Sequence, residues 1–476
     1  MDKRKVIAER RDSVAPAKQR SYQEIVTYLN EHWQTGDKAG SLKRMEALNR
    51  ALGSVAQEKD SIIVCGTNGK SLTLHFAARL LQAEGLNVGV LYAPHILTYN
   101  ERVVTNAGTM PNRSFTDLGN LVIDTAERLR LAVNSSEVLS MMAFLFFKES
   151  KVDVMLLEAH EGGAQNPVNI CHAKVVAITR VTGDKAVTPE AELTELLREC
   201  AGVIKKDTHV VAGDQIKNQL RIIEEISEEV GARWAMPIRK LAQLPYPFEQ
   251  LHGRCAALAE RISSLYINNF VAPQTTVVSD SLLVKQKGRR GRPTLEAKRQ
   301  ANLNPKKTVE QFWKENISEL SGRFQLLDKE NPSVLLDSAD NLDALENTLL
   351  GLRLLHYQRP TDGVAIVMAA RAGAFEGEEF SKMLRYFLKK TPGRVFICPV
   401  AHGQVPGCGL GESWNVESIT DELKLRKIKA EAHSSFESAF EAAQTSVNGR
   451  NGLIAILGSH AVINSYWQLR GIKKLG

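Results

Sequence analysis

The feature that most constrains this chain is a six-residue loop near its start, with the sequence Gly66-Thr67-Asn68-Gly69-Lys70-Ser71. A β-branched run at residues 61–65 precedes the loop, and an amphipathic stretch at residues 72–85 follows it. A Gly-x-x-Gly-Lys-Ser sequence between a strand and a helix is typical of a phosphate-binding loop. Its glycines let backbone N–H groups turn toward phosphate oxygens, and the helix N-terminus adds the positive end of its dipole. The alternative is a glycine-rich turn that binds nothing, but strand, loop, lysine and helix together favour the phosphate site.

Two side chains of this loop have roles that follow from their chemistry. Lys70 is expected to reach the β- and γ-phosphates of a nucleotide, and the Ser71 hydroxyl is expected to bind Mg²⁺. The loop therefore predicts ATP and Mg²⁺ as ligands.

Apolar runs alternate with amphipathic stretches along most of the chain, which is the pattern of parallel sheets buried on both faces. The expected strands are residues 61–65, 87–93, 152–159, 173–181, 209–213, 333–338, 363–370, 394–400 and 452–459. The expected helices are residues 21–52, 72–85, 137–148, 216–230, 342–356 and 378–390. The alternation breaks once, near residues 275–315, and then restarts. The pattern therefore predicts two α/β domains joined at that break.

The composition excludes several classes of protein. The 476 residues contain no run of about 18 apolar residues, which excludes a membrane-spanning helix. Residues 1–20 lack the apolar stretch of a secretory signal. Six cysteines are scattered without a Cys-x-x-Cys pair, which argues against a disulfide scaffold and a structural zinc site. These features favour a cytoplasmic protein that does not contact a membrane.

The positive charge is concentrated in two short segments. Residues 285–307 contain nine Lys or Arg residues and one acid, and residues 1–20 contain seven Lys or Arg residues and three acids. Because the whole chain has a formal charge of +7, the remaining residues are net acidic. The run Arg-Arg-Gly-Arg-Pro at 289–293 resembles an AT-hook, whose arginines enter the minor groove of DNA. A solvated basic loop near an anionic substrate or RNA is the other interpretation.

Several motifs resemble those of one family of enzymes. The segments SYQEIVTYLNEHW and GSLKRMEALNRALG, followed by CGTNGKS, resemble the opening of the folylpolyglutamate synthase/dihydrofolate synthase family of the Mur ligase superfamily. The resemblance continues, in the same order, through APHILTYNERV, LLEAHEGGAQNPVN, ECAGVIKKDTHVVAG, LHGR, LSGRFQLL and LLDSADN. It covers about residues 21 to 341, and the remainder matches mainly in its strand pattern.

The resemblance implies a fold and a reaction. The fold would be an N-terminal P-loop parallel-sheet domain (21–275) and a smaller C-terminal Rossmann-like α/β domain (316–476), with a basic tail at 1–20 and a basic linker or inserted loop at 276–315. The reaction would be an ATP-dependent ligation in which a folate or pteroate acid is phosphorylated to an acyl phosphate and then attacked by the amine of glutamate. The family also implies a monomer in folate and one-carbon metabolism.

The resemblance also assigns roles to residues of this chain. Residues 66–71 would hold the ATP phosphates, with Lys70 as a catalytic residue. Glu158 would be a catalytic and metal-binding carboxylate beside Ser71, while Arg323, Asp337 and Asn341 would hold ATP from the second domain. His95 and Asp184 would contact the acid substrate.

The departures from the family pattern are concentrated at the metal site. Ala93 replaces a metal-binding serine, Lys185 a metal-binding histidine, and Cys200 a lysine that the family carbamylates. Three further family residues are also replaced: a histidine by Asp340, a loop arginine by Ala164, and an asparagine expected after Gly253-Arg254. The family's Gly-Lys-Gly-Ser has become Gly-Lys-Ser-Leu. Oxygen, nitrogen and carbamate ligands of Mg²⁺ are therefore lost together.

Two hypotheses account for these departures. In the first, the Lys185 ammonium is catalytic and substitutes for one metal ion, which leaves a single Mg²⁺ on Ser71 and Glu158. In the second, the chain is a catalytically impaired, nucleotide-binding pseudoenzyme whose basic segment at 285–307 contacts nucleic acid or a partner.

Overall fold

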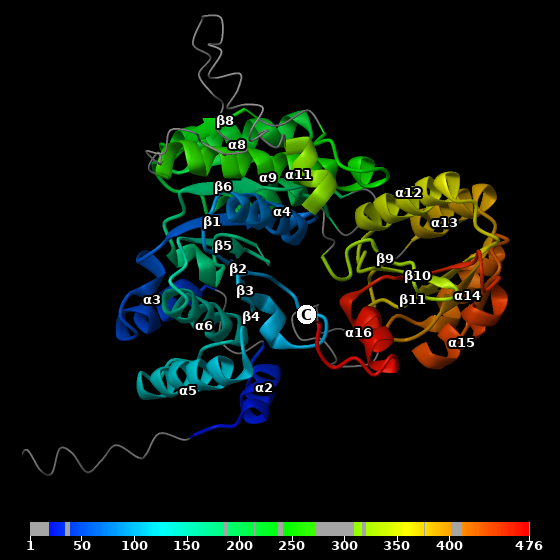
Figure 1. Cartoon of the computed structure of the whole chain (residues 1–476), viewed down its shortest axis with the longest axis horizontal. Coiled ribbons are helices and arrows are strands. Elements are labelled where there is room, and N and C mark those ends of the chain that lie inside the picture. The colour runs from blue at the N-terminus through cyan, green and yellow to red at the C-terminus, as the bar shows by residue number, and fades with distance from the viewer. Residues whose placement is uncertain are drawn as a thin grey trace, which may run out of the picture.

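The computed structural model describes residues 19–33, 39–160, 162–183, 188–213, 215–236, 241–271, 309–316, 320–375, 377–400 and 412–475. These residues form two α/β lobes that lie side by side (Figure 1). The two-domain α/β fold expected from the sequence is thereby confirmed. None of the described helices is long and apolar enough to cross a membrane.

The first domain is built on an eight-stranded sheet in the order β4-β3-β2-β5-β1-β6-β7-β8. The strands are β1 (Asp60–Cys65), β2 (Val88–Leu91), β3 (Val103–Thr105), β4 (Gly108–Thr109), β5 (Val154–Glu158), β6 (Val175–Ile178), β7 (His209–Ala212) and β8 (Arg233–Ala235). Strands β2, β5, β1, β6, β7 and β8 pair in parallel, and β3 and β4 add an antiparallel edge beside β2. Because β1 lies between β5 and β6, the loop after it opens at the middle of the sheet's carboxyl edge.

Helices cover both faces of this sheet, so its central strands are apolar on both sides. Ile62 and Val64 of β1 face one core, and Ile63 and Cys65 face the other, as the two-residue period of a strand requires. One face carries α4 (Lys70–Ala83), α9 (Phe248–Phe270) and α11 (Val309–Asn316). The other carries α2 (Tyr22–Glu31), α3 (Ser41–Ala51), α5 (Asn112–Arg128), α6 (Ser135–Glu149), α7 (Glu190–Ala201) and α8 (Lys217–Glu229), with the short 3₁₀ helices η1 (Val55–Gln57), η2 (Tyr99–Arg102) and η3 (Pro167–Ile170) nearby.

The second domain repeats this layered plan on a smaller scale. Its six-stranded sheet has the order β13-β12-β11-β14-β10-β9, and only β9 pairs antiparallel. The strands are β9 (Gln325–Leu327), β10 (Ser333–Asp337), β11 (Val364–Met368), β12 (Gly393–Ile397), β13 (Ala430–Ala432) and β14 (Leu453–Leu457). One face packs on α12 (Leu342–Gln358), α13 (Glu378–Lys390) and α14 (Val416–Leu425), and the other on α15 (Phe436–Ser446) and α16 (His460–Leu469).

The two domains share apolar contacts on both faces of the second sheet. Leu251 of α9 is buried in the core under α12, and Ile96 of the loop after β2 is buried in the core under α16. The Asn464 side chain donates to the Ile96 carbonyl at 2.6 Å. Figure 1 shows α16, in red, on the side of the second lobe that faces the first. These contacts set the distance between the carboxyl edges of the two sheets.

Most sequence predictions of regular structure are confirmed in place, with one correction. The expected strands at 61–65, 152–159 and 333–338 correspond to β1, β5 and β10. The expected helix at 21–52 is wrong as a single element, because α2 ends at Glu31 and α3 begins at Ser41 after Gly40. Helices α5, α7, α9, α14, α15 and α16 are not among the expected elements. Helices α9 and α16 pack on the sheets, whereas α5 packs on α2 and α6.

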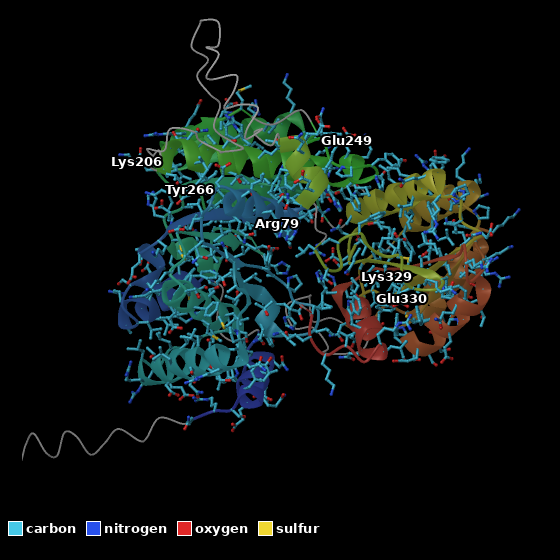
Figure 2. All side chains as sticks on the ribbon, viewed as in Figure 1. Arg79, Lys206, Glu249, Tyr266, Lys329 and Glu330 are labelled. Carbon is cyan, nitrogen blue, oxygen red and sulfur yellow. The ribbon has the colours of Figure 1, made fainter. Side chains whose placement is uncertain are left out.

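Helix α11 returns the chain to the first domain. The end of the predicted 276–315 segment is therefore helical, while residues 272–308, including the basic run at 285–307, lie outside the described residues, as do residues 1–18 of the basic tail. Trp313 is 1% exposed and lies edge to face on Phe76 of α4, with the ring centroids 5.0 Å apart. Its indole N–H donates to Glu260 at 2.8 Å. Arg79 of α4, labelled in Figure 2, donates to the Asn316 carbonyl at 3.4 Å.

We expect Trp313→Ala to destabilise the first domain by about 3–5 kcal/mol, because it removes a fully buried aromatic side chain and leaves the Glu260 carboxylate without this donor. Trp313→Phe keeps most of the volume and should lose less than half as much. Urea unfolding of both variants, followed by circular dichroism, measures the difference. A change of under about 1 kcal/mol for Trp313→Ala would show that α11 does not support the core.

Candidate functional site

A cavity of about 710 Å³ lies between the two domains, at the carboxyl edges of both sheets. Its polar side comes from the ends of strands and the loops after them: Thr67, Asn68, Lys70, Ser71, Glu158, His160, Arg180, Arg323, Asp337, Asp340, Asp343 and His460. Its apolar side comes from α9, α12 and α13, through Leu251, Leu258, Leu349, Leu350, Met383 and Phe387. A concave site with one polar and one apolar side is suited to a small molecule that carries both kinds of group.

The loop between β1 and α4 has a backbone that only glycine permits. Gly66 has φ +135°, and a Cβ there would lie 2.2 Å from the Thr179 hydroxyl oxygen. Gly69, which precedes α4, has φ +88°. The ammonium of Lys70 is buried and donates to the carbonyl oxygens of Gly66 and Thr67, both at 2.9 Å. The loop therefore wraps around its own lysine, and the N-terminal N–H groups of α4, which have no partner within the helix, begin directly after it.

The start of this loop is fastened to the segment after β6. The N–H groups of Thr67 and Asn68 donate to the Arg180 carbonyl at 2.8 and 3.1 Å. The Thr67 hydroxyl donates to the Thr182 carbonyl at 2.9 Å and accepts from the Thr182 N–H at 3.1 Å. The loop thus has a preformed conformation set by its neighbouring strand.

Glu158 ends β5 inside the cavity, where its side chain is 1% exposed. Burial raises the pKa of this carboxyl, but the nearby His160, the charge of Lys70 and the Ser71 hydroxyl outweigh burial, so its pKa lies below the usual range. The Nδ1 atom of His160 is 3.8 Å from Glu158 Oε1. The Ala93 N–H also donates to Glu158 at 3.3 Å. Glu158 is therefore an ionised carboxylate in contact with the Ser71 hydroxyl.

This pair of oxygen ligands fits a magnesium ion that is shared with nucleotide phosphates. Mg²⁺ in such sites is bound by one or two protein oxygens, while phosphates and water supply the rest of its shell. Among the described residues, no group of three or more His, Cys, Asp or Glu side chains is arranged to hold a metal. The chain's own contribution, Glu158 with Ser71, is suited to a metal that arrives with a nucleotide.

The second domain places a guanidinium and a carboxylate opposite the loop. Arg323 donates to the Ser71 hydroxyl at 3.5 Å. Asp337, at the end of β10, accepts the Phe324 N–H at 2.7 Å. Burial raises the pKa of Asp337 to about 6, although the charge of Arg323 lowers it in part. A carboxylate at the end of a parallel strand is placed to accept hydrogen bonds from a ligand's hydroxyl groups.

Asn341 caps the N-terminus of α12 and also reaches the phosphate loop. Its side-chain amide exchanges two hydrogen bonds with the amide of Asn68, at 3.1 and 2.9 Å. Its Oδ1 accepts the Ala344 N–H at 3.0 Å. The predicted nucleotide residues Asn68 and Asn341, which are 273 positions apart, are therefore in direct contact across the domain junction.

Not all of the predicted site residues converge here. His95 is buried but does not line the cavity, and Arg102 donates to its Nδ1 at 2.9 Å, which places the ring proton on Nε2. Burial and the charge of Arg102 lower the pKa of His95 well below its usual range. Asp184 and Lys185 lie outside the described residues.

Cys200 lies behind the phosphate loop. Its thiol is a close neighbour of the thiol of Cys65, the residue that precedes Gly66. Cys65 in turn contacts the Gly162 carbonyl oxygen at 3.1 Å. The position that holds a carbamylated lysine in the family pattern is therefore filled by a buried thiol pair in this chain.

Sequence reasoning missed several polar residues of the cavity, among them Arg180, Asp343 and His460. Arg180 follows β6, and His460 follows β14 after Gly458 and Ser459. Burial lowers the pKa of His460 well below its usual range, and the charge of Arg323 adds to this effect, so the imidazole is neutral at pH 7. A simple signal was present, because polar residues directly after parallel strands share one edge of the sheet.

No family model matches the chain, but curated proteins resemble it. It is 24% identical to a folylpolyglutamate synthase from Lacticaseibacillus casei over 407 residues, which cover 83% of this chain and 91% of that protein. It is 28% identical to a dihydrofolate synthase/folylpolyglutamate synthase from Bacillus subtilis over 245 residues, which cover 50% of this chain and 54% of that protein. The chain thus spans most of the first relative and about half of the second.

Solved structures share the fold across nearly the whole chain. Folylpolyglutamate synthase from Mycobacterium tuberculosis, complexed with ADP, superimposes with a TM-score of 0.72 at 19% identity and covers 94% of this chain and 98% of that one. The bifunctional synthase from Yersinia pestis, complexed with AMPPNP and a Mn ion, has a TM-score of 0.69 at 20% identity, with coverages of 96% and 100%. A complex of FPGS with AMPPCP and folate has a TM-score of 0.68 at 19% identity, with coverages of 95% and 100%.

The raised pKa of Asp337 predicts a pH dependence of stability. The native state holds the Asp337 proton up to about pH 6, whereas the unfolded chain releases it near pH 3.8, so stability falls as pH rises between these values. We expect Asp337→Asn, which keeps the acceptor for the Phe324 N–H, to be more stable than the wild type by roughly 3 kcal/mol at pH 7.5. Urea midpoints measured at pH 7.5 and pH 3.5 test this, and an equal difference at both values would contradict it.

Proposed function

We propose that this chain, a relative of the folylpolyglutamate synthase/dihydrofolate synthase family, is an ATP-dependent ligase that joins a folate-type acid to the amine of glutamate. One observation supports this most directly. The phosphate loop, with its Lys70, and Glu158 at the end of β5 face Arg323 and Asp337 across a single cavity. The fold is shared with synthases complexed with ADP and AMPPNP.

The nucleotide would lie along the polar side of the cavity. Its phosphates would take the N–H groups at the start of α4 and the ammonium of Lys70, which would exchange its bonds to loop carbonyls for phosphate oxygens. Asp337 would accept a hydrogen bond from a ribose hydroxyl. The apolar surface of α9 and α12, including Leu251 and Leu349, would cover the base.

Ser71 and Glu158 would hold a Mg²⁺ ion, which supplies positive charge to the phosphates when it is bound. The chain's own cations act in the same place. Arg323 lies 3.5 Å from the Ser71 hydroxyl, so its guanidinium reaches the same phosphate region from the second domain. Lys70 and Arg323 therefore approach a transferred phosphoryl group from opposite domains, which stabilises charge that develops on its oxygens.

The reaction would proceed by transfer of the γ-phosphoryl group to the acid, which forms an acyl phosphate and ADP. The glutamate amine would then attack the acyl carbon, form the amide bond and release phosphate. Water would hydrolyse the acyl phosphate, so the site must exclude it. Ile96 and Leu251 pack against the second domain in two separate apolar clusters, which would help to keep the domains together during the reaction.

Lys185 is proposed to supply positive charge where the family pattern has a metal-binding histidine. This assignment rests on the sequence, in which Lys185 follows Asp184 shortly after β6. A protonated lysine does not ligate Mg²⁺, but it can neutralise phosphate charge itself. Together with Ser71 and Glu158, it would allow turnover with one metal ion.

Purified protein should release ADP from Mg²⁺-ATP only when both an acid and glutamate are present. Dihydropteroate and tetrahydrofolate are the acids to compare, and a coupled ADP assay measures the rate. Lys70→Ala should reduce the rate by at least 100-fold, because it removes the main cation of the phosphate loop.

Two outcomes would contradict the ligase. ADP release that is independent of acid and glutamate would indicate a simple ATPase. ATP binding without release under any combination would favour the nucleotide-binding pseudoenzyme, and the basic segment at 285–307 would then be tested by its deletion in a nucleic-acid binding assay.

Lys185→Ala should lose far more turnover than Cys200→Ala. The lysine is assigned a charge at the phosphates, whereas Cys200 is a buried thiol that contacts Cys65 and does not line the cavity. The expected losses in kcat are about 100-fold and under 3-fold. Equal losses in the two variants would reject the idea that Lys185 replaces a metal ion.

A further inference from the structure

Arg180 occupies an unusual place between the phosphate loop and the second domain. Its carbonyl oxygen accepts the N–H groups of Thr67 and Asn68 at 2.8 and 3.1 Å. Its guanidinium, on the other side, contacts Asp343 of α12 through Nε and Nη2, both 2.7 Å from Oδ1. One residue of the first domain therefore holds the loop with its main chain and the second domain with its side chain.

Asn68 is bound by both Arg180 and Asp343, and also by Asn341. Its backbone N–H is held by Arg180, while its side-chain amide donates to Asp343 Oδ2 at 2.8 Å and exchanges two hydrogen bonds with Asn341. Asp343 thus uses one carboxylate oxygen for Arg180 and the other for Asn68. Arg180, Asn68, Asp343 and Asn341 form a closed network, which we call the interdomain clasp.

The clasp makes the side-chain position of Asn68, within the phosphate loop, depend on the second domain. If α12 moves away, the Asn68 side chain loses its hydrogen bonds to Asn341 and Asp343, and Arg180 loses its counter-ion. The backbone bonds to the Arg180 carbonyl would remain, because both ends belong to the first domain. Any ligand that requires the loop conformation seen here therefore favours docking of the second domain, and docking favours that ligand by the same factor.

We propose that Arg180 and Asp343 are positioning residues, which fix Asn68 of the phosphate loop and thereby couple nucleotide affinity to docking of the second domain. The inference rests on the proposed nucleotide site but not on ligase turnover. It goes beyond the nucleotide-holding roles of the loop and of Asn341, because Arg180 and Asp343 act through Asn68.

Both residues also line the cavity, so direct contact with the nucleotide is the competing explanation. A double-mutant cycle separates the two, because residues that act through one another are not additive. Affinity for Mg²⁺-AMPPNP would be measured by isothermal titration calorimetry on the full chain, with Arg180→Ala, Asp343→Ala and the double variant. Arg180→Ala keeps the carbonyl that holds the loop and removes the guanidinium that contacts Asp343.

We expect each single variant to weaken AMPPNP binding about 5-fold, and the double variant to be no weaker than the worse of the two. Arg180→Lys, which keeps a charged donor, should recover part of the loss. Arg198→Ala, which breaks the exposed ion pair with Glu195 on α7, is the matched control and should bind as the wild type does. Losses that multiply in the double variant, or single losses under about 1.5-fold, would overturn the proposal.

A second readout reports docking itself. Without nucleotide, the radius of gyration from small-angle X-ray scattering should be larger for the two clasp variants than for the wild type, and saturating AMPPNP should restore it. An unchanged radius together with weaker binding would indicate direct contact with the nucleotide and would overturn the coupling. A wild type that does not bind AMPPNP would overturn both this proposal and the nucleotide site.

The ligase proposal fails separately. A wild type that binds AMPPNP, shows a non-additive cycle and releases no ADP with any acid would leave the clasp in place without a ligase. An active ligase whose double-mutant cycle is additive would support the ligase and overturn the clasp.

Discussion

The contact between Gly66 and Thr179 is the constraint on which the site depends. A side chain at position 66 would collide with the Thr179 hydroxyl, so the loop after β1 must lie directly against the end of β6. That closeness lets the Arg180 carbonyl accept the N–H groups of Thr67 and Asn68. It also turns the loop around the Lys70 ammonium and aims the start of α4 into the cavity. The phosphate-binding geometry is therefore a product of strand packing and not of the loop alone.

The charges of the cavity are balanced by pairs from different segments. Lys70 and His160 keep the buried Glu158 ionised, and the pKa of that carboxyl lies below its usual range. Arg323 only partly offsets the burial of Asp337, whose pKa rises to about 6. The two carboxyl groups differ in proton affinity because the surroundings of Glu158, Lys70 among them, outweigh its burial, whereas burial dominates at Asp337 despite the charge of Arg323. This difference suits a metal-binding role for Glu158 and a hydrogen-bonding role for Asp337.

The replaced residues of the family pattern fall into two structural groups. Ala93 still contacts Glu158, but through its backbone N–H, so a protein ligand oxygen is lost while the carboxylate stays in place. Cys200 instead is a buried neighbour of Cys65, the residue directly before the phosphate loop.

The sequence alone determined the two α/β domains, the phosphate loop and its lysine, and the carboxylates that end β5 and β10. These features are encoded locally, because apolar runs, the glycines of the loop and polar residues at the ends of strands can be recognised in short segments of sequence. It did not separate α2 from α3, and it missed Arg180 and His460, whose roles arise from segments distant in the chain. Only the tertiary structure decided that Asn68 meets Asn341 and Asp343, because that contact depends on how two separately folded sheets dock. It likewise showed that His95 is buried against Arg102 and is not a lining residue of the cavity.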